Sequence, residues 1–193
     1  MHMSRSEQNK TQNDSDHNDL AEFNLIRDGD MDAMSRLFKQ NYKPLYYFAA
    51  KFVRNPDIAE NMVQDVFLKV WSGREELQIK HSVKSLLYTM TRNQSLNYLK
   101  RNKIVPLTEE NLTKSSYLTG SAEENYIEKE MHESIYQAIN KLPHQCRQVF
   151  LMKRYDNLKY TEISEVLNIS INSVKTQMKR ALKFLLKHLK NLT

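Results

Sequence analysis

Residues that break regular backbone structure are scarce in this chain, and this scarcity constrains its fold more than any other feature. The 193 residues include only 3 glycines and 4 prolines, whereas glycine alone usually makes up about 7% of a protein. Sandwiches, barrels and hairpins need many tight turns, which glycine and proline supply. The sequence therefore predicts an all-α protein. Its glycines are too far apart to form a loop that cradles phosphate groups.

Apolar residues recur at helical spacing on both sides of a polar stretch, which predicts two small helical domains joined by a flexible linker. In the first domain, helices are expected to start at Asp30, Pro44, Pro56 and Ser82, and the last of them to end near Arg101. The predicted divisions are a disordered polar arm over residues 1–18, a first domain over 19–102, a linker over 103–121 and a second domain over 122–193.

The segment over residues 160–182, YTEISEVLNISINSVKTQMKRAL, carries the most information. A short amphipathic helix ends near Leu167, and a three-residue turn follows. In that turn Asn168 tolerates the left-handed conformation, Ile169 fills the gap between the helices, and Ser170 is a good N-cap for the next helix. This pattern predicts a helix-turn-helix whose second helix reads DNA.

The second helix of this motif has two different faces. Its predicted buried stripe consists of Val174, Met178, Ala181 and Leu185. The opposite face carries amides, hydroxyls and cations suited to base edges and phosphates: Asn172, Ser173, Lys175, Thr176, Lys179, Arg180 and Lys183. A helical hairpin with a solvated basic face is the simpler interpretation. Such a hairpin, however, would not need the short turn, the gap-filling Ile169 and the Ser170 cap together.

The net charge of +6 is unevenly distributed. Residues 80–103 and residues 170–193 each hold six Lys or Arg residues and no acid, so the rest of the chain is acidic overall. A solvated surface usually mixes both signs. Two basic segments without acids therefore predict two contacts with one polyanion, such as DNA.

Several classes of protein find no support in the composition. Cys146 is the single cysteine, and the 6 histidines are scattered, so no disulfide, metal site or cofactor is expected. The longest apolar run, residues 45–50, is far too short to span a bilayer. The N-terminus lacks the apolar core of a signal peptide. We therefore expect a cytoplasmic protein that does not insert into a membrane, with Cys146 in a structural role.

Three segments carry a resemblance to a known family. Residues 55–71 (NPDIAENMVQDVFLKVW) and 82–102 (SVKSLLYTMTRNQSLNYLKRN) resemble the polymerase-binding and minus-ten-reading part of a bacterial sigma factor, and residues 139–185 resemble its minus-thirty-five-reading part. The two-domain plan is similar to the extracytoplasmic-function (ECF) group. The resemblance implies a protein that binds core RNA polymerase, directs it to promoters, helps to melt promoter DNA and catalyses nothing itself.

The resemblance also implies sites. On the helix that starts at Pro56, the residues expected to bind core polymerase are Asn61, Gln64, Asp65 and Leu68. The residues expected to bind the minus-ten element are Lys84, Tyr88, Arg92, Asn93, Asn97, Lys100 and Arg101, and the loop over 73–81 would capture a flipped base. Tyr88 could equally belong to the core, and Trp71 is expected there. The basic face after Ser170 would bind the minus-thirty-five element.

Departures from the family pattern lie around the helix-turn-helix. Lys159 stands where the family often has a serine cap, which predicts a weaker helix start. Asn157 and Asn168 replace frequent glycines, which asparagine tolerates. Factors of this group are usually held inactive by an anti-sigma protein, often one bound to the membrane, so such a partner is expected here.

Two other functions compete with this one. A helix-turn-helix regulator would bind an operator as a dimer, without core polymerase, and would not need the motif over residues 55–71. An enzyme acting on nucleic acid would need catalytic carboxylates near a histidine motif or a metal site, and the sequence shows neither.

Overall fold

The computed structural model describes residues 19–53, 55–102, 135 and 137–189, and all regular structure in these ranges is helical, which confirms the predicted all-α class. The chain divides into two compact units, Met1–Ser95 and Leu96–Thr193. Helix α4 (Val83–Arg101) continues through this boundary and ends one residue before the predicted end of the first domain. The predicted arm and linker, and residues 122–134 of the second domain, lie outside the described residues.

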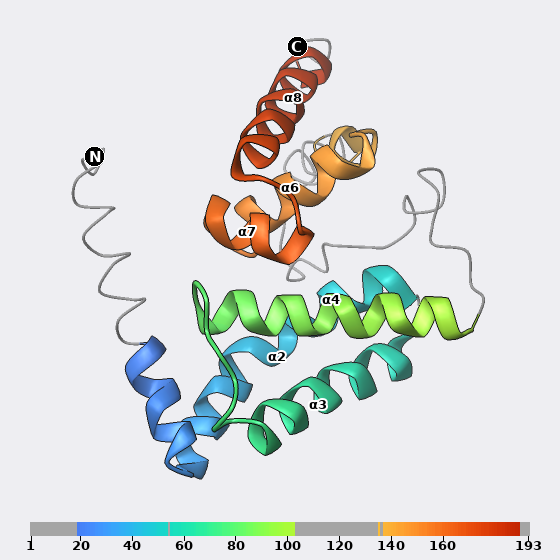
Figure 1. Ribbon diagram of the computed structural model, residues 1–193. Helices are drawn as coiled ribbons and strands as arrows, with labels where there is room; N and C mark the ends of the chain where they lie inside the picture. The colour runs from blue at the N-terminus through green and yellow to red at the C-terminus, as the bar shows by residue number, and fades with distance from the viewer. Residues whose placement is uncertain (1–18, 54, 103–134, 136, 190–193) are drawn as a thin grey trace, which may run out of the picture. The chain divides into compact units, whose positions relative to one another are not determined.

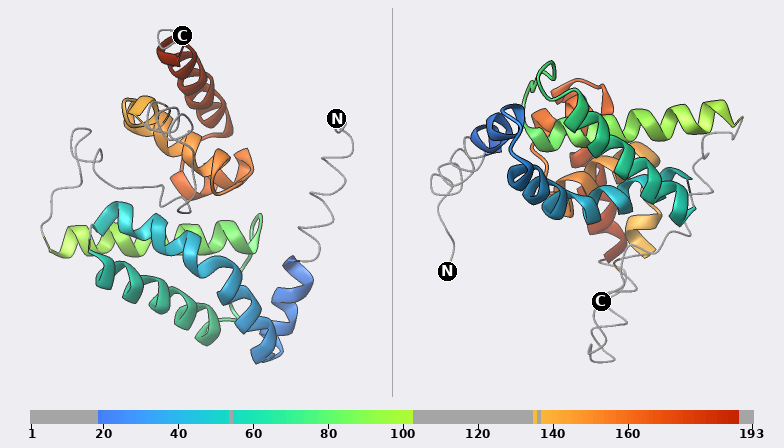
Figure 2. Two further views of the ribbon diagram at one scale, coloured as in Figure 1. Left: turned by 180° about the vertical axis from the view of Figure 1, so that it is seen from behind. Right: turned by 90° about the horizontal axis from the view of Figure 1, so that it is seen from below.

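The first unit consists of a helical segment over residues 19–27 followed by α2 (Met31–Val53), α3 (Pro56–Ser72) and the larger part of α4. Helices α2 and α3 pack side by side, as both Figure 1 and Figure 2 show. The rings of Phe38 on α2 and Phe67 on α3 lie 4.8 Å apart between centroids. Tyr88 brings α4 against α2, since its ring lies 5.0 Å from that of Phe48.

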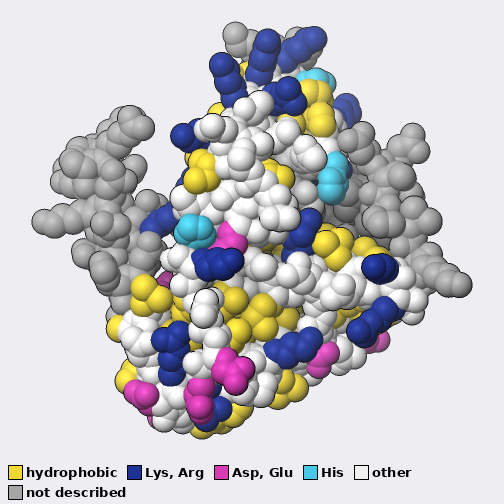
Figure 3. All heavy atoms as spheres, viewed as in Figure 1, with side chains coloured by type: hydrophobic (Ala, Val, Ile, Leu, Met, Phe, Trp, Pro, Cys, Tyr) yellow, Lys and Arg dark blue, Asp and Glu magenta, His cyan; other side chains and the backbone are white. Residues whose placement is uncertain are grey.

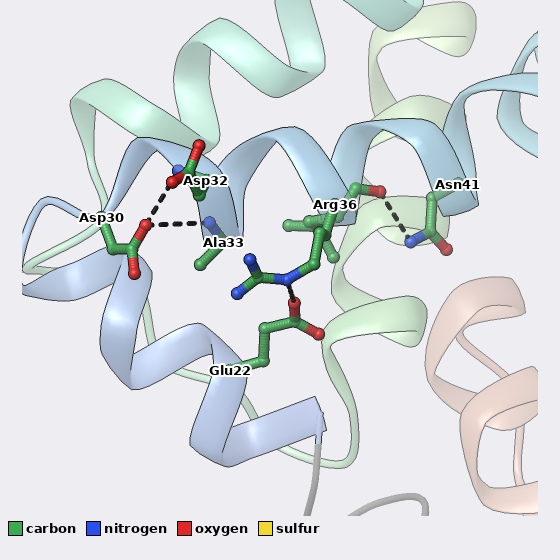
Figure 4. Close-up of polar contacts among 7 residues, drawn as sticks. Glu22, Asp30, Asp32, Ala33, Arg36 and Asn41 are labelled. Carbon is green, nitrogen blue, oxygen red and sulfur yellow. Dashed lines mark hydrogen bonds and ion pairs between the residues drawn. The ribbon is translucent and has the colours of Figure 1, made fainter.

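A glycine and an aspartate set the start of α2. Gly29 ends the preceding helix in the left-handed region, with φ +91, where residues with a Cβ are strained. Asp30 then caps α2 as predicted, because its Oδ1 accepts the backbone N–H groups of Asp32 (2.8 Å) and Ala33 (3.0 Å) (Figure 4). One turn later, Arg36 pairs with Glu22 of the preceding helix at 2.6 Å.

The expected helix break at Pro44 is wrong, because α2 runs without interruption from Met31 to Val53 with Pro44 inside it. A proline inside a helix removes one backbone hydrogen bond and strains the preceding turn. Here the apolar stripe continues on both sides of the proline, with Leu37 before it and Leu45 and Phe48 after it, all buried. Burial of this continuous stripe outweighs the lost hydrogen bond.

Helices α3 and α4 begin and end where the sequence predicts. Asn55 caps α3 by accepting the Ile58 N–H (3.2 Å), Pro56 occupies the first turn, and Gly73 follows the last residue. Six side chains of α3 are buried and form its core face: Ala59, Met62, Val63, Val66, Phe67 and Val70. At the start of α4, Ser82 Oγ accepts the Ser85 N–H at 3.0 Å, which confirms the predicted opening.

The second unit contains a helical turn over residues 137–140, then α6 (His144–Arg154), α7 (Tyr160–Leu167) and α8 (Ile171–Leu189). Helix α8 packs against both α6 and α7 (Figure 1). One core cluster joins the first turn of this unit, α6 and the later half of α8: Ala138, Ile139, Leu142, Cys146, Leu151, Ala181 and Leu185. This packing fixes the direction of α8.

We predict that Pro44→Ala stabilises the first unit by about 1–3 kcal/mol, because alanine restores the missing backbone hydrogen bond inside α2. Urea unfolding followed by the fluorescence of Trp71, the single tryptophan of the chain, measures this change. Pro56→Ala is the matched control, since a proline in the first turn lacks no helical hydrogen bond and its replacement should change stability by less than about 1 kcal/mol. A destabilised Pro44→Ala variant would contradict the prediction.

Candidate nucleic-acid and protein interfaces

The turn between α7 and α8 has the geometry expected of a helix-turn-helix. Asn168 adopts the left-handed conformation (φ 53, ψ 48), and its N–H bonds back to carbonyl groups of α7. Ser170 Oγ accepts the Ser173 N–H at 3.1 Å, so Ser170 caps α8. Both predicted roles are confirmed. The turn thereby fixes the angle at which α8 leaves α7.

The start of α7 contains an interaction that the sequence reasoning missed. The Glu162 carboxylate accepts the backbone N–H of Lys159 at 2.5 Å, which supplies one half of a capping box. The lysine side chain cannot supply the other half. A glutamate three residues after the expected cap position was the available signal. Just before this start, Asn157 has φ 52, so asparagine does occupy a left-handed position here.

Helix α8 shows the two faces predicted for it. Val174, Met178, Ala181 and Leu185 are all buried, which confirms the stripe. Six of the seven residues predicted to bind DNA are exposed: Asn172, Lys175, Thr176, Lys179, Arg180 and Lys183. The seventh, Ser173, is half-buried beside Ser170. Figure 3 shows Lys and Arg side chains gathered at the C-terminal part of α8.

An amide–thiol cluster holds α8 against α6. Gln177 of α8 accepts a hydrogen bond from the Cys146 thiol (3.0 Å between Sγ and Oε1) and donates one to Gln145 (3.0 Å). Burial raises the pKa of the Cys146 thiol, and the nearby charge of Arg180 acts weakly in the opposite direction. Cys146 is buried, in line with its expected structural role.

In the first unit, α3 turns a mixed polar and apolar face outward. Asn61, Gln64, Asp65 and Leu68 are all exposed, and Leu68 keeps 65% of its surface accessible. Gln64 donates to Glu60 at 3.3 Å, one turn earlier on α3. Asp65 accepts a hydrogen bond from Gln94 of α4 at 3.0 Å. The four residues therefore form one continuous exposed ridge along α3.

Along α4 the predicted DNA-binding residues differ in their exposure. Asn93, Asn97, Lys100 and Arg101 are exposed, whereas Lys84 and Arg92 are half-buried. Burial lowers the pKa of Arg92. Its Nε is buried and has no hydrogen-bond partner among the described residues. A guanidinium with an unsatisfied donor is well suited to an anionic partner.

Two aromatic side chains, Tyr88 and Trp71, lie in other environments than those predicted. Tyr88, predicted to contact DNA with the core as the alternative, is fully buried with its ring edge-on to Phe48, so it has no free face on which a base could stack. Its assignment to the DNA-binding set is corrected accordingly. Trp71, expected in the core, is half-buried instead, and the Arg74 guanidinium lies 4.6 Å from the centroid of its ring.

A long-range hydrogen bond anchors the loop over residues 73–81. Arg27, from the helical segment over 19–27, donates from Nη2 to the Leu77 carbonyl oxygen at 2.9 Å. This bond ties the loop to the helical segment over residues 19–27. The predicted role of the loop in base capture stays a prediction.

The described residues contain no group of three or more His, Cys, Asp or Glu side chains arranged to hold a metal ion. Over the same ranges, no helix combines the length and apolar character needed to cross a membrane.

Comparison with known proteins gives matches over both units. The family described as Sigma-70 region 2 matches residues 37–104, and the family described as Sigma-70, region 4 matches residues 132–185. The RNA polymerase sigma factor SigV of Bacillus subtilis is 26% identical over 140 residues, which cover 72% of this chain and 81% of SigV. The ECF RNA polymerase sigma factor SigW of the same organism is 26% identical over 176 residues, covering 86% of this chain and 94% of SigW.

Solved structures agree on the fold. CnrH in complex with the cytosolic domain of CnrY matches with a TM-score of 0.60 at 17% identity, covering 91% of this chain and 99% of that one. The sigma factor RpoE of Bartonella quintana, in complex with the anti-sigma factor NepR, matches with a TM-score of 0.55 at 18% identity, covering 81% and 96% of the two chains.

The two matched regions, in this order and with a helix-turn-helix in the second, define a bacterial sigma factor, and the chain belongs to the sigma-70 family. Within that family it is a sigma factor of the ECF group, an alternative sigma factor that directs transcription initiation. The expected resemblance is thus confirmed.

We predict that Cys146 reacts slowly with alkylating reagents in the folded protein. Burial raises the pKa of its thiol, so at pH about 8 the reactive thiolate is scarcer than in a free cysteine, and reagents reach it poorly. Reaction with iodoacetamide, followed by mass spectrometry, should be at least about tenfold slower in buffer than in concentrated urea. Equal rates in the two solutions would show that Cys146 is accessible.

Proposed function

We propose that the chain binds core RNA polymerase through the exposed ridge of α3 and places it on promoters through α4 and α8. The observation that carries this proposal is the ridge itself, formed by Asn61, Gln64, Asp65 and Leu68. An exposed leucine flanked by an amide and a carboxylate is typical of a protein interface, because burial of the apolar side chain adds affinity and the polar groups add specificity.

At the minus-thirty-five element, α8 would enter the major groove with its first turns. Asn172 can bond base edges there, while Lys175 and Lys179 follow at positions suited to phosphates. The cap at Ser170 and the buried stripe of α8 support this role, because they hold the helix rigidly while its polar face stays open.

At the minus-ten element, α4 would contact the DNA strand through its exposed face. Asn93 and Asn97 lie about one turn apart and suit base edges, and Lys100 and Arg101 suit phosphates. Lys84 and Arg92, which are half-buried, would add positive charge that attracts the DNA phosphates. The loop over residues 73–81, held by Arg27, would receive an unpaired base.

The chain itself would catalyse no reaction and would act in the cytoplasm, where core polymerase and DNA are found. A regulatory partner is also part of the proposal. The similar RpoE of Bartonella quintana was solved with an anti-sigma factor, and CnrH with the cytosolic domain of CnrY. By analogy, an anti-sigma protein, membrane-bound in many members of the group, would hold this chain inactive.

For the polymerase interface we predict that Gln64→Ala combined with Asp65→Ala weakens binding to core RNA polymerase at least about tenfold, since the central residues of an interface carry most of its energy. Fluorescence anisotropy of labelled protein titrated with core polymerase measures the change. The matched control replaces an exposed Gln and an exposed Asp outside α3, Gln40→Ala with Asp28→Ala, and should bind like the unmodified protein.

Unmodified protein that fails to bind core polymerase would overturn the proposal. It would favour a regulator that binds an operator on its own.

For promoter recognition we predict different effects for two residues of α8. Asn172→Ala should reduce discrimination against altered minus-thirty-five bases about tenfold, because an amide reads base edges. Lys179→Ala should weaken binding to all promoters alike and reduce its salt dependence, because a lysine pairs with phosphate. Both are measured by holoenzyme binding to a set of promoter fragments at several salt concentrations. The prediction fails if the two variants behave alike.

A further inference from the structure

One polar bridge joins the ridge of α3 to α4, and it runs through Gln94. Lys69 on α3 donates from Nζ to Gln94 Oε1 at 2.9 Å. Gln94 in turn donates from Nε2 to Asp65 Oδ2 at 3.0 Å. The bridge thus ends on Asp65, one of the proposed polymerase-binding residues. Neither the charge pattern nor the helical periodicity of the sequence pointed to Gln94.

The bridge is unexpected because Asp65 and Lys69 lie four residues apart on α3. An acid followed by a base at this spacing usually forms a direct ion pair on the helix surface. Within the part of the chain that the structure describes, the two side chains form no such pair. Each instead bonds to the amide of Gln94, which offers an acceptor to the cation and a donor to the anion.

This arrangement leaves the carboxylate of Asp65 more available than an ion pair would. A carboxylate can accept several hydrogen bonds, and a neutral amide donor occupies one position without cancelling the charge. Direct pairing with Lys69 would offset that charge and draw the side chain along α3. The amide therefore orients Asp65 and separates it from its nearest cation.

We propose that Gln94 is a positioning residue for polymerase binding: it replaces a direct Lys69–Asp65 ion pair and so leaves the carboxylate available and turned outward for core RNA polymerase. This inference rests on the proposed function of the α3 ridge. It also links the polymerase-facing helix to the helix that carries Asn93 and Asn97, the proposed minus-ten contacts.

The test first removes the bridge with Gln94→Ala and then removes the competing cation with Lys69→Ala. Gln94→Ala should weaken binding to core polymerase, in the absence of DNA, about two- to fivefold, because Lys69 then pairs with Asp65. Adding Lys69→Ala to this variant should restore affinity to within about twofold of the unmodified protein, since no cation is left to compete. Lys69→Ala alone should bind like the unmodified protein, and so should Gln40→Ala, the exposed glutamine used as a control.

The salt dependence of binding is a second measurement, and it distinguishes an electrostatic effect from a loss of packing, which salt would not change. The ratio between the affinities of the unmodified protein and Gln94→Ala should shrink from about 0.05 M to about 0.5 M salt, because the exposed Lys69–Asp65 pair is screened. Failure of Lys69→Ala to restore the affinity of the Gln94→Ala variant, or a ratio independent of salt, would overturn the role of Gln94.

The same titrations separate this inference from the function on which it rests. If Asp65→Asn weakens binding while Gln94→Ala does not, only the role of Gln94 is wrong. If the unmodified protein does not bind core polymerase, both the proposed function and the inference fall.

Discussion

Burial of one side of α3 is the constraint on which the first unit depends. Its apolar stripe packs against α2 through Phe67 and Phe38, and Met62 lies under Ser95 of α4, with 3.7 Å between the sulfur and the hydroxyl oxygen. Because a helix is rigid, burial of this side dictates that the opposite side faces outward. The ridge around Gln64 and Asp65 is therefore a direct result of how the core forms. The proposed binding face needs no separate structural element, because the core beneath it holds it in place.

The sequence predicted α3 and α8 well because their apolar residues follow a clear helical period. It predicted the bounds of α4 but not which of its side chains are buried, for a physical reason. Small hydroxyl residues fill part of its buried side: Thr91 and Ser95 are fully buried, and each hydroxyl bonds the carbonyl four residues earlier (2.8 Å in both). A buried side that contains such residues leaves no apolar stripe to detect, so the position of Tyr88 could not be decided from the sequence.

Interactions between residues far apart in the chain could not be predicted from the sequence either. The continuity of α2 through Pro44 depends on packing on both sides of the proline, which local preference does not report. The bridge from Asp65 to Gln94 joins positions 29 residues apart. The turn around Asn168, in contrast, was predictable, because its backbone conformation and the cap at Ser170 are both local. The sequence thus predicted most of the local backbone chemistry, although not the bond between Glu162 and the Lys159 N–H, and it did not predict contacts between helices.

Helix α8 separates the residues that fold the second unit from those proposed to read DNA. Val174, Met178 and Ala181 are buried in the core, while Asn172, Lys175 and Lys179 are exposed to solvent. Substitutions on the outer face therefore leave stability almost unchanged. On the proposed role of this face, promoter preference can therefore change one residue at a time without disturbing the core of the second unit.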